Sequence, residues 1–372
     1  MTQSRAAGRL RVLPRVLASR LFPRRKPAQP KRVLVAHHLL LGDVMMLAPL
    51  LAKLRERFSQ ADVAMTVRRA LVPLFARSPY GVRAIPYDPR DSSTLDRLFD
   101  EKPFDLALIP GDNRYSWLAA AAGARWIVAF AGDRPAYKSW PVDEEIPYPD
   151  RPAAWSDMTA NLVAGPAPSP FRGGDWPAPP FAPFERPSAR YVVFHVGAGS
   201  PLRLWRPERW RTLADHFRER GYLVAWSAGP GEERLVEEID PQRRHLSYAG
   251  MLDLAQLWQL LSNAALLVSL DTGIAHLAKL VAVPSVVLFG PGSSVLFGRG
   301  EFWRDAPYRE VTIHDFPCRD QRTLFKRRIE WVRRCQRSTD ECAEPRCMHA
   351  IGVEPVLAAA AGLLADMTVP QR

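Results

Sequence analysis

The sequence predicts an α/β protein with two domains, each built on a parallel β-sheet. Its 372 residues exceed the usual size of one domain, and an apolar fraction of 47% supplies material for two cores. In both halves of the chain, apolar runs of strand length alternate with stretches of helical periodicity. This alternation is typical of parallel sheets, because a crossover between parallel strands usually contains a helix.

The most informative stretch lies in the second half, at residues 265–291. It combines a strand, a tight polar turn, a short helix and another strand. The three regular elements are expected at 265–270, 275–283 and 285–289. The turn holds Asp271, Thr272 and Gly273. Free backbone N–H groups at such a helix start can bind an anion such as a phosphate. The alternative is that Asp271 merely caps the helix.

The first half repeats this arrangement. A strand at 33–37 is followed by the turn Gly42–Asp43 and by a helix whose apolar side chains recur at helical spacing. Further strands are expected at 63–67, 106–109 and 125–130. We therefore predict an independent N-terminal α/β domain over residues 33–164.

A Pro-rich segment at 165–189 separates the halves, because proline removes backbone donors and favours extended chain. The second domain is expected at 190–348, and a C-terminal helix and tail at 349–372. Before the 265–291 stretch, this domain should contain strands at 191–196 and 223–227 and a helix at 251–261.

Residues 1–32 form a basic arm with ten Arg or Lys residues and no acid. Four leucines recur there at roughly helical spacing: Leu10, Leu13, Leu17 and Leu21. This pattern suits an amphipathic stretch lying on anionic lipid, although Pro14 weakens it. A solvated disordered arm and a transit peptide are the alternatives.

The formal charge of +12 and the pI near 9.9 predict attraction to a polyanion: nucleic acid, an anionic membrane or a phosphorylated glycolipid. Nucleic acid is disfavoured, because the densest basic run is the N-terminal arm and basic residues are not interleaved with aromatic ones on one face. No Gly-x-Gly-x-x-Gly fingerprint follows a strand and no Gly-Lys-Ser/Thr loop occurs. These absences disfavour a nicotinamide enzyme and a P-loop hydrolase.

Four cysteines are confined to one late segment: Cys318, Cys335, Cys342 and Cys347. No secretory signal is visible, so we interpret them as reduced thiols of a cytoplasmic protein. No Cys-x-x-Cys pair occurs, and we predict no metal site. No apolar run reaches the length that a membrane span needs.

Each half thus offers a glycine-bearing turn with an acid at the carboxyl end of a strand. Ligands of open α/β sheets bind at such strand ends, so the two domains are expected to face one another across a cleft. One half would bind a nucleotide and the other a second substrate. There is no Asp-x-Asp pair to hold a divalent cation on a diphosphate, so Arg side chains and helix N-termini would have to stabilise one.

Four blocks carry a family resemblance. In chain order they are LVAHHLLLGDVMMLAPLLAKLRERF, PGDNRYSWLAAAAGARWIVAF, HVGAGSPLRLWRPERW and SLDTGIAHLAKLVAVPSVVLFGP. They resemble successive blocks of the ADP-heptose:lipopolysaccharide heptosyltransferases and their relatives, glycosyltransferase family nine, and CMHAIGVEPVL resembles that family's C-terminal end. The resemblance implies a GT-B fold of two Rossmann-like domains. The N-terminal half would take the acceptor and the C-terminal half the nucleotide sugar, in an inverting, metal-independent transfer without a cofactor.

The resemblance assigns catalysis to Asp43, which matches the family's proposed general base. An ionised carboxylate at a cleft-facing helix start could take the proton from an acceptor hydroxyl as that oxygen attacks the anomeric carbon. The alternative for Asp43 is an N-cap of the helix. Asn113 and Arg114, in the early GDNRYS turn, could reach acceptor phosphates or sugar hydroxyls, or could simply belong to a solvated loop.

The donor block implied by the resemblance comprises Asp271, Thr272 and Gly273, whose backbone N–H groups would meet the diphosphate. His276 could touch the same phosphates, or could be a packed core histidine.

Other donor residues come from two loops earlier in the second half. Arg203 lies about where the family places a cation on the diphosphate, and Arg206 is a neighbouring candidate because the loop could shift register. Ser200 could add a hydroxyl. Glu232 corresponds to the acid that would bond the ribose hydroxyls, with Glu233 as the alternative. Either acid could simply be favoured by the helix dipole.

Three departures from the family pattern weaken the choice of heptose as the sugar. Gly292–Ser293 stands where the family usually has Thr–Ser or Thr–Asp, Phe297 stands near a usual Trp, and the HVGAGS loop lacks the typical threonines. We therefore predict a glycosyltransferase that uses a nucleotide sugar, an ADP-sugar by resemblance. Its acceptor would be an anionic glycolipid, such as lipopolysaccharide core, at the inner face of the cytoplasmic membrane. The alternative is a non-catalytic GT-B protein that binds nucleotide or glycolipid.

Overall fold

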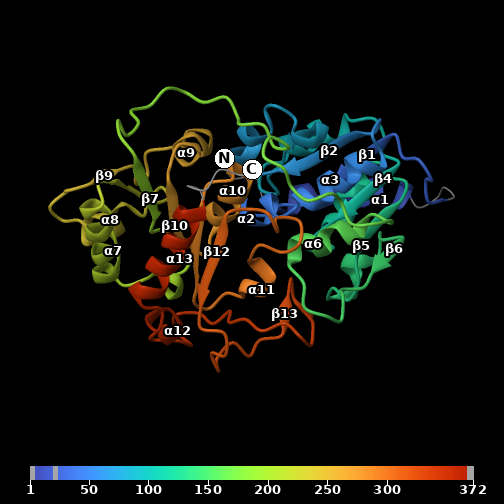
Figure 1. Ribbon diagram of the computed structural model, residues 1–372. Coiled ribbons are helices and arrows are strands. Elements are labelled where there is room, and N and C mark those ends of the chain that lie inside the picture. Colours follow the sequence, from blue (N-terminus) through green and yellow to red (C-terminus); the bar gives the residue numbers. More distant parts are fainter. Residues whose placement is uncertain (1–4, 20–23, 367–372) are drawn as a thin grey trace. The chain divides into compact units, whose positions relative to one another are not determined.

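A computed structural model describes residues 5–19 and 24–366 of the chain. Parts of the predicted arm (1–4 and 20–23, with Leu21) and of the predicted tail (367–372) lie outside the described residues. The chain divides into two compact units (Figure 1). Unit 1 comprises Met1–Ser169, Asp175–Pro177 and Thr323–Val332, and unit 2 comprises Pro170–Gly174, Ala178–Arg322 and Arg333–Arg372. Within the described ranges, no helix is long and apolar enough to span a membrane.

Unit 1 is built on a six-stranded parallel sheet with the order β3-β2-β1-β4-β5-β6. Its strands are β1 (Arg32–Val35), β2 (Asp62–Val67), β3 (Val82–Pro86), β4 (Leu106–Ile109), β5 (Ile127–Phe130) and β6 (Glu144–Ile146). Val33 of β1 pairs with Val63 of β2 on one side and with Leu106 of β4 on the other. The strand order therefore reverses between β1 and β4.

Helices and short 3-10 segments connect these strands. The helices are α1 (Arg5–Ser19), α2 (Leu41–Met45), α3 (Ala48–Arg57), α4 (Ser93–Phe99), α5 (Tyr115–Ala121) and α6 (Trp155–Thr159). The 3-10 segments are η1 (Arg69–Phe75), η2 (Pro79–Gly81), η3 (Ala136–Ser139) and η4 (Ala160–Leu162). The hairpin of β13 (Thr323–Leu324) and β14 (Arg327–Arg328) also belongs to unit 1, although it comes late in the chain.

Unit 2 repeats the topology of unit 1, with the order β12-β11-β10-β7-β8-β9 and all neighbours parallel. Its strands are β7 (Tyr191–His195), β8 (Leu223–Ser227), β9 (Leu246–Ser247), β10 (Leu266–Leu270), β11 (Ser285–Phe289) and β12 (Tyr308–Thr312). Its helical segments are η5 (Pro201–Arg203), α7 (Pro207–Glu219), α8 (Glu233–Ile239), α9 (Leu254–Ser262), α10 (Gly273–Val281), α11 (Ser294–Phe297), α12 (Arg346–His349) and α13 (Val353–Asp366).

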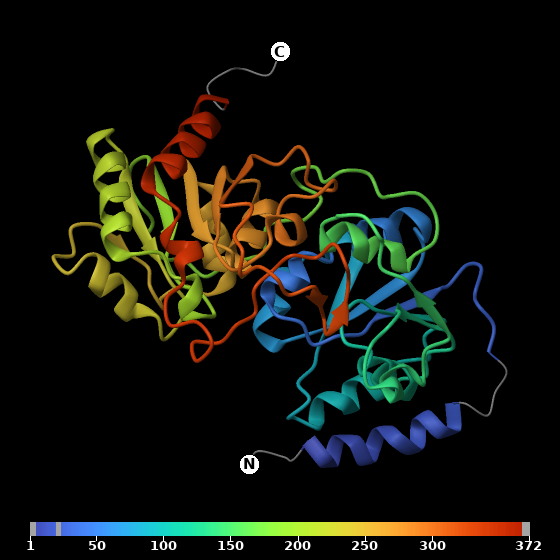
Figure 2. The same ribbon diagram turned by 90° about the horizontal axis from the view of Figure 1, so that it is seen from below.

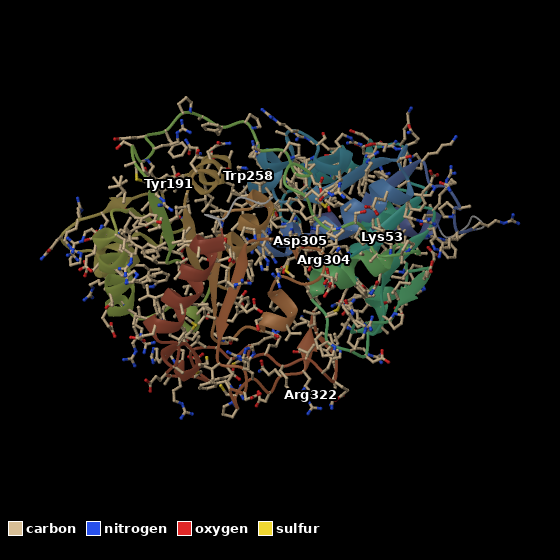
Figure 3. All side chains as sticks on the ribbon, in the orientation of Figure 1. Lys53, Tyr191, Trp258, Arg304, Asp305 and Arg322 are labelled. Atoms are coloured by element: carbon tan, nitrogen blue, oxygen red, sulfur yellow. The ribbon has the colours of Figure 1, made fainter. Side chains whose placement is uncertain are left out.

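The two parallel sheets confirm the predicted α/β class. The residues of β7, β10 and β11 are buried along their whole length, as expected for parallel strands covered on both faces. In unit 2, the Tyr191 hydroxyl donates to the Leu260 carbonyl at 2.6 Å and so joins β7 to α9, the helix that also carries Trp258 (Figure 3). This contact fixes the amino end of β7, opposite the end where the ligand loops begin.

The Pro-rich segment 165–189 contains no helix or strand, and parts of it belong to each unit. In unit 1, buried Lys53 of α3 donates from Nζ to the Gly165 carbonyl at 2.9 Å (Figure 3). Buried Trp176 donates from Nε1 to the Leu74 carbonyl at 3.0 Å. These contacts anchor Gly165 and Trp176, the parts of the segment that belong to unit 1, within that unit.

Candidate functional site

The reversal of strand order in unit 2 lies between β7 and β10, which is where open α/β sheets bind ligands. Two predicted donor residues meet there. Arg203, from the loop after β7, donates from Nη1 to the backbone carbonyl of Asp271 at 2.7 Å. The same nitrogen lies 3.9 Å from the Asp271 carboxylate. Arg203 is partly exposed, so its guanidinium remains accessible to an anion at this edge of the sheet.

Asp271 is buried and does not cap α10. The N-cap residue of α10 is Thr272, and no side-chain cap bond is formed. Burial raises the pKa of Asp271, while the positive charges of Arg203, Arg334 and Lys279 oppose that rise. The capping alternative for Asp271 is therefore wrong, and its carboxylate instead lies within a cluster of positive charge.

The unusual Gly292 has a physical explanation in this cluster. A Cβ atom on Gly292 would lie 2.1 Å from Oδ2 of Asp271 and 3.4 Å from the Phe289 ring. The loop after β11 can approach the buried carboxylate this closely only without a side chain. The packing around Asp271 thus explains why glycine stands at position 292.

Two buried polar atoms at the start of α10 have no hydrogen-bond partner among the described residues: Thr272 Oγ1 and His276 Nδ1. Burial, with the charges of Lys279 and Arg203, lowers the pKa of His276 well below its usual value, so the imidazole is neutral. Unpaired buried polar atoms are rare in proteins and are satisfied when a ligand or water binds. Gly273 is the first residue of the helix beside them.

Glu232 is held by backbone N–H groups from the loop after β7 and the loop after β8. Its Oε1 accepts from Ala198 N at 3.0 Å and its Oε2 from Gly229 N at 2.8 Å. A Cβ on Gly197 would lie 2.0 Å from Oε2, so Gly197 makes room for the carboxylate. A carboxylate has about four acceptor positions, so roughly two remain for a ligand. Glu233 instead is exposed and accepts from Gly231 N at 3.0 Å.

The other two donor candidates have different surroundings. Ser200 accepts from Leu202 N at 3.3 Å and so caps η5. Arg206 directs its Nη2 to His349 Nδ1 at 3.2 Å and lies 3.6 Å from Glu344. The structure therefore brings Arg203, not Arg206, to Asp271.

Sequence reasoning missed Lys279, which lies on the buried face of α10. Its ammonium donates to the Gly298 carbonyl at 2.8 Å and lies 4.4 Å from the centre of the Trp303 ring. The signal for it was a lysine inside the otherwise apolar helix IAHLAKLV. A buried lysine that is hydrogen-bonded and stacked adds fixed positive charge near Asp271, and this charge opposes the rise in the pKa of Asp271 that burial causes.

In unit 1 the reversal of strand order lies between β1 and β4. Asp43 is half-buried in the first turn of α2, on the connection that follows β1. The N-cap residue of α2 is Leu40, with no side-chain cap bond, so Asp43 does not cap this helix. His37, at the start of the same connection, is buried, and burial lowers its pKa to about 3.

Asn113, on the loop after β4, has no exposed surface. Its amide nitrogen donates to the Phe130 carbonyl and to Ser139 Oγ, both at 2.9 Å, and its backbone N–H donates to Asp133 at 2.7 Å. Arg114, next to it, is exposed and pairs with an Asp112 oxygen at 3.0 Å. Of the two predicted acceptor residues, only Arg114 is therefore open to a ligand.

The side-chain oxygen of Asn113 accepts from Arg327, a residue that sequence reasoning did not identify. Arg327 Nη2 donates to Asn113 Oδ1 at 2.7 Å, and Nε donates to the Ala131 carbonyl at 2.9 Å. The same guanidinium lies 3.4 Å from Asp133, which also pairs with Lys138 at 3.0 Å. The β13–β14 hairpin thus completes a buried polar network beneath the loop that carries Arg114.

The four cysteines are free and line one cavity of unit 2, of about 330 Å³, together with Leu202 and Pro291. Burial raises the pKa of the Cys347 thiol to about 11. In the part of the chain that the structure describes, no group of three or more His, Cys, Asp or Glu side chains is arranged to hold a metal ion.

Comparison with solved structures identifies the same fold. The glycosyl transferase family 9 protein from Veillonella parvula superposes with a TM-score of 0.69 at 18% identity, covering 90% of this chain and 98% of that one. The E. coli ADP-heptose lps heptosyltransferase II gives a TM-score of 0.69 at 18% identity, covering 91% and 100%. At this identity the likeness concerns the fold.

Comparison of sequences gives more specific relatives. Lipopolysaccharide heptosyltransferase 1 of Pseudomonas aeruginosa is 32% identical over 149 residues, covering 37% of this chain and 42% of the relative. Lipopolysaccharide heptosyltransferase 3 of Escherichia coli is 29% identical over 142 residues, covering 36% and 40%. The chain thus aligns with about two fifths of the length of these relatives.

A family model described as glycosyltransferase family 9 (heptosyltransferase) matches residues 95–314. This range includes β10, α10 and β11 with the Asp271 turn, and it covers more than half of the chain. The match agrees with the two parallel sheets and with the solved structures that share them. The chain therefore belongs to glycosyltransferase family 9.

Proposed function

We propose that this protein transfers a sugar, heptose or a related one, from a nucleoside diphosphate donor to a lipid-linked saccharide such as lipopolysaccharide core. The observation that carries the proposal is the hydrogen bond from Arg203 to the Asp271 carbonyl, just before the N-terminus of α10 in unit 2. Relatives named as lipopolysaccharide heptosyltransferases, and a structural neighbour, the E. coli heptosyltransferase WaaC solved with ADP, support a heptose-type sugar and an ADP-type donor.

In this proposal unit 2 binds the donor. The backbone N–H groups at Thr272 and Gly273 and the guanidinium of Arg203 would neutralise the diphosphate. Thr272 Oγ1 and His276 Nδ1, which lack partners among the described residues, would be satisfied by phosphate or sugar oxygens or hydroxyls. The free acceptor positions of Glu232 would take the ribose hydroxyls.

Unit 1 would bind the acceptor and supply the base. The acceptor oxygen attacks the anomeric carbon while its proton passes to the Asp43 carboxylate, and the bond from that carbon to the diphosphate breaks. The configuration inverts, because the attack is a single displacement. The negative charge that develops on the nucleoside diphosphate is stabilised by Arg203, by the buried ammonium of Lys279 and by the N-terminus of α10. These cations can replace a divalent metal in that role.

Arg114 would contact phosphates or hydroxyls of the acceptor, and Asn113 would hold the turn that presents it. An acceptor of this class places the enzyme at the inner face of the cytoplasmic membrane. The surplus of positive charge, +12, favours an anionic glycolipid there.

The test is incubation of the purified protein with ADP-heptose or other ADP-sugars and a delipidated lipopolysaccharide-core acceptor. We expect release of ADP and an acceptor heavier by one sugar in the mass spectrum. If the protein binds ADP but neither product forms with any donor and core fragment, the proposal is refuted in favour of a non-catalytic nucleotide- or glycolipid-binding protein.

A further inference from the structure

Helix α1 is a fixed part of unit 1. Val16 is fully buried in the unit 1 core, and Val12 packs against that core from the same side of the helix. Arg11 forms an ion pair with Asp96 and donates to the Ser92 carbonyl at 3.1 Å, and both partners belong to the start of α4. Pro14 lies inside the helix without ending it. A disordered arm is therefore wrong for residues 5–19.

The outward side of α1 is apolar. Leu10, Leu13 and Leu17 are 74%, 47% and 53% exposed. Pro14 and Ala18 are exposed as well. At about 100° per residue, these five positions fall within an arc of about 140°. We call this surface, residues 10, 13, 14, 17 and 18, the leucine ridge.

The ridge reverses the usual arrangement of a surface helix, which turns its leucines toward the core. Here the valines are docked, and the three leucines keep 47–74% of their surface exposed to solvent. In Figure 2, α1 (dark blue) lies along the margin of unit 1 with its outer side free of other drawn elements. A cluster of exposed apolar side chains of this kind marks an interaction surface.

The charges beside the ridge favour an anionic lipid surface as its partner. The sequence of α1 contains four arginines and no acid. Arg15 borders the ridge on the helix and stacks on the Phe99 ring at 4.3 Å, whereas Arg11, at the same border, is already paired with Asp96. Long cationic side chains at the border of an apolar face reach lipid phosphates while the apolar face enters the acyl region. A docked helix also loses little conformational freedom on binding.

We propose that the leucine ridge of α1 is a membrane-docking surface that inserts into a bilayer containing anionic phospholipid. The proposal rests on the proposed function only in the choice of membrane, because the acceptor is lipid-linked. It would bring unit 1, the acceptor-binding unit in that function, to the surface that carries the acceptor.

The test is co-sedimentation of the full chain with vesicles of phosphatidylglycerol and phosphatidylethanolamine, compared with pure phosphatidylcholine. Because removing one leucine side chain from water changes a partition coefficient about tenfold, the variant L10S/L13S/L17S should bind at least about 100-fold more weakly. The matched control L246S/M251S/I313S changes three exposed apolar residues of unit 2 and should bind like wild type. The wild type should bind pure phosphatidylcholine vesicles more weakly than vesicles that contain phosphatidylglycerol.

Equal binding of the ridge variant and the wild type to anionic vesicles would overturn the proposal. A second outcome would also overturn it: the wild type forms a dimer, and the ridge variant is monomeric but binds vesicles as well as the wild type does. The ridge would then bind a second copy of the chain. Circular dichroism and the variant L10S alone check that a loss of binding is not a loss of folding. The vesicles contain neither donor nor acceptor, so this result is independent of ADP release with a soluble acceptor.

Discussion

Replacing Arg327 by methionine tests whether the β13–β14 hairpin is a structural part of unit 1. The guanidinium of Arg327 is buried, and it donates to Asn113 Oδ1 and to the Ala131 carbonyl. Methionine has similar length but donates nothing. Asp133 would keep its partner Lys138, whereas Asn113 Oδ1 would be left buried without this donor and the half-buried Ala131 carbonyl would lose its donor.

The expected loss of stability follows from these contacts. Each buried acceptor left without a donor costs about 1–3 kcal/mol, and removing one member of a buried charged cluster costs about 3–5 kcal/mol. We therefore expect Arg327→Met to lower the free energy of unfolding of unit 1 by about 3–5 kcal/mol. The neighbouring Arg328 is the matched control. Its side chain is 73% exposed and pairs with Glu330 at 2.7 Å, so Arg328→Met should change stability by less than about 1 kcal/mol.

The assay combines urea unfolding with hydrogen exchange of the native state. Arg327→Met should lower the unfolding midpoint and speed exchange at the Asn113 amide and along residues 323–332, while Arg328→Met should leave both unchanged. Arg327→Met should also raise KM for the acceptor more than it lowers kcat, because the loop bearing Arg114 loses its support. Identical stability and exchange in the two variants would refute the assignment of the hairpin to unit 1.

Three further substitutions test the geometry of unit 2. Gly197→Ala places a Cβ 2.0 Å from Oε2 of Glu232, so the carboxylate must move. ADP affinity measured by calorimetry should therefore fall about tenfold. Unchanged affinity would show that Glu232 is not part of the nucleotide site. Gly292→Ala meets the buried Asp271 carboxylate at 2.1 Å, and thermal unfolding should show a loss of about 1–3 kcal/mol. Burial lowers the pKa of His195 to about 4 in the folded protein, whereas in the unfolded chain it is about 6.5. As the pH falls, the unfolded chain therefore binds a proton on His195 before the folded protein does. The free energy of unfolding falls as the pH drops from about 6.5 toward 4. Between pH 7 and pH 5 the wild type should lose about 2 kcal/mol more than His195→Gln, and equal losses would contradict a buried neutral histidine.

The strands that could be predicted from the sequence are the interior ones. All eight expected strands are present, as β1, β2, β4 and β5 in unit 1 and β7, β8, β10 and β11 in unit 2. Within the two six-stranded sheets, the four strands that were missed, β3, β6, β9 and β12, are the edges; the β13–β14 hairpin was missed as well. Edge strands expose one side to solvent and carry polar residues such as Arg83 and Glu145, so no apolar run marks them.

The same limit applies to the site. The meeting of Arg203 with the Asp271 turn could be predicted, because both follow strands that adjoin in a Rossmann-like sheet. The contact between Arg327 and Asn113 joins residues 214 positions apart, and the hairpin that makes it has no periodic pattern. The burial of Lys279 depends on the Trp303 ring, which only the folded chain places beside it.

The central claim is that unit 1 supplies the base through Asp43 while unit 2 holds the nucleotide. The most direct measurement is the single-turnover rate of sugar transfer by Asp43→Asn, with ADP affinity determined on the same preparation. We predict a rate lower by at least about 100-fold, as for loss of a general base, with ADP affinity within about twofold of wild type. Transfer at the wild-type rate by Asp43→Asn would contradict the claim.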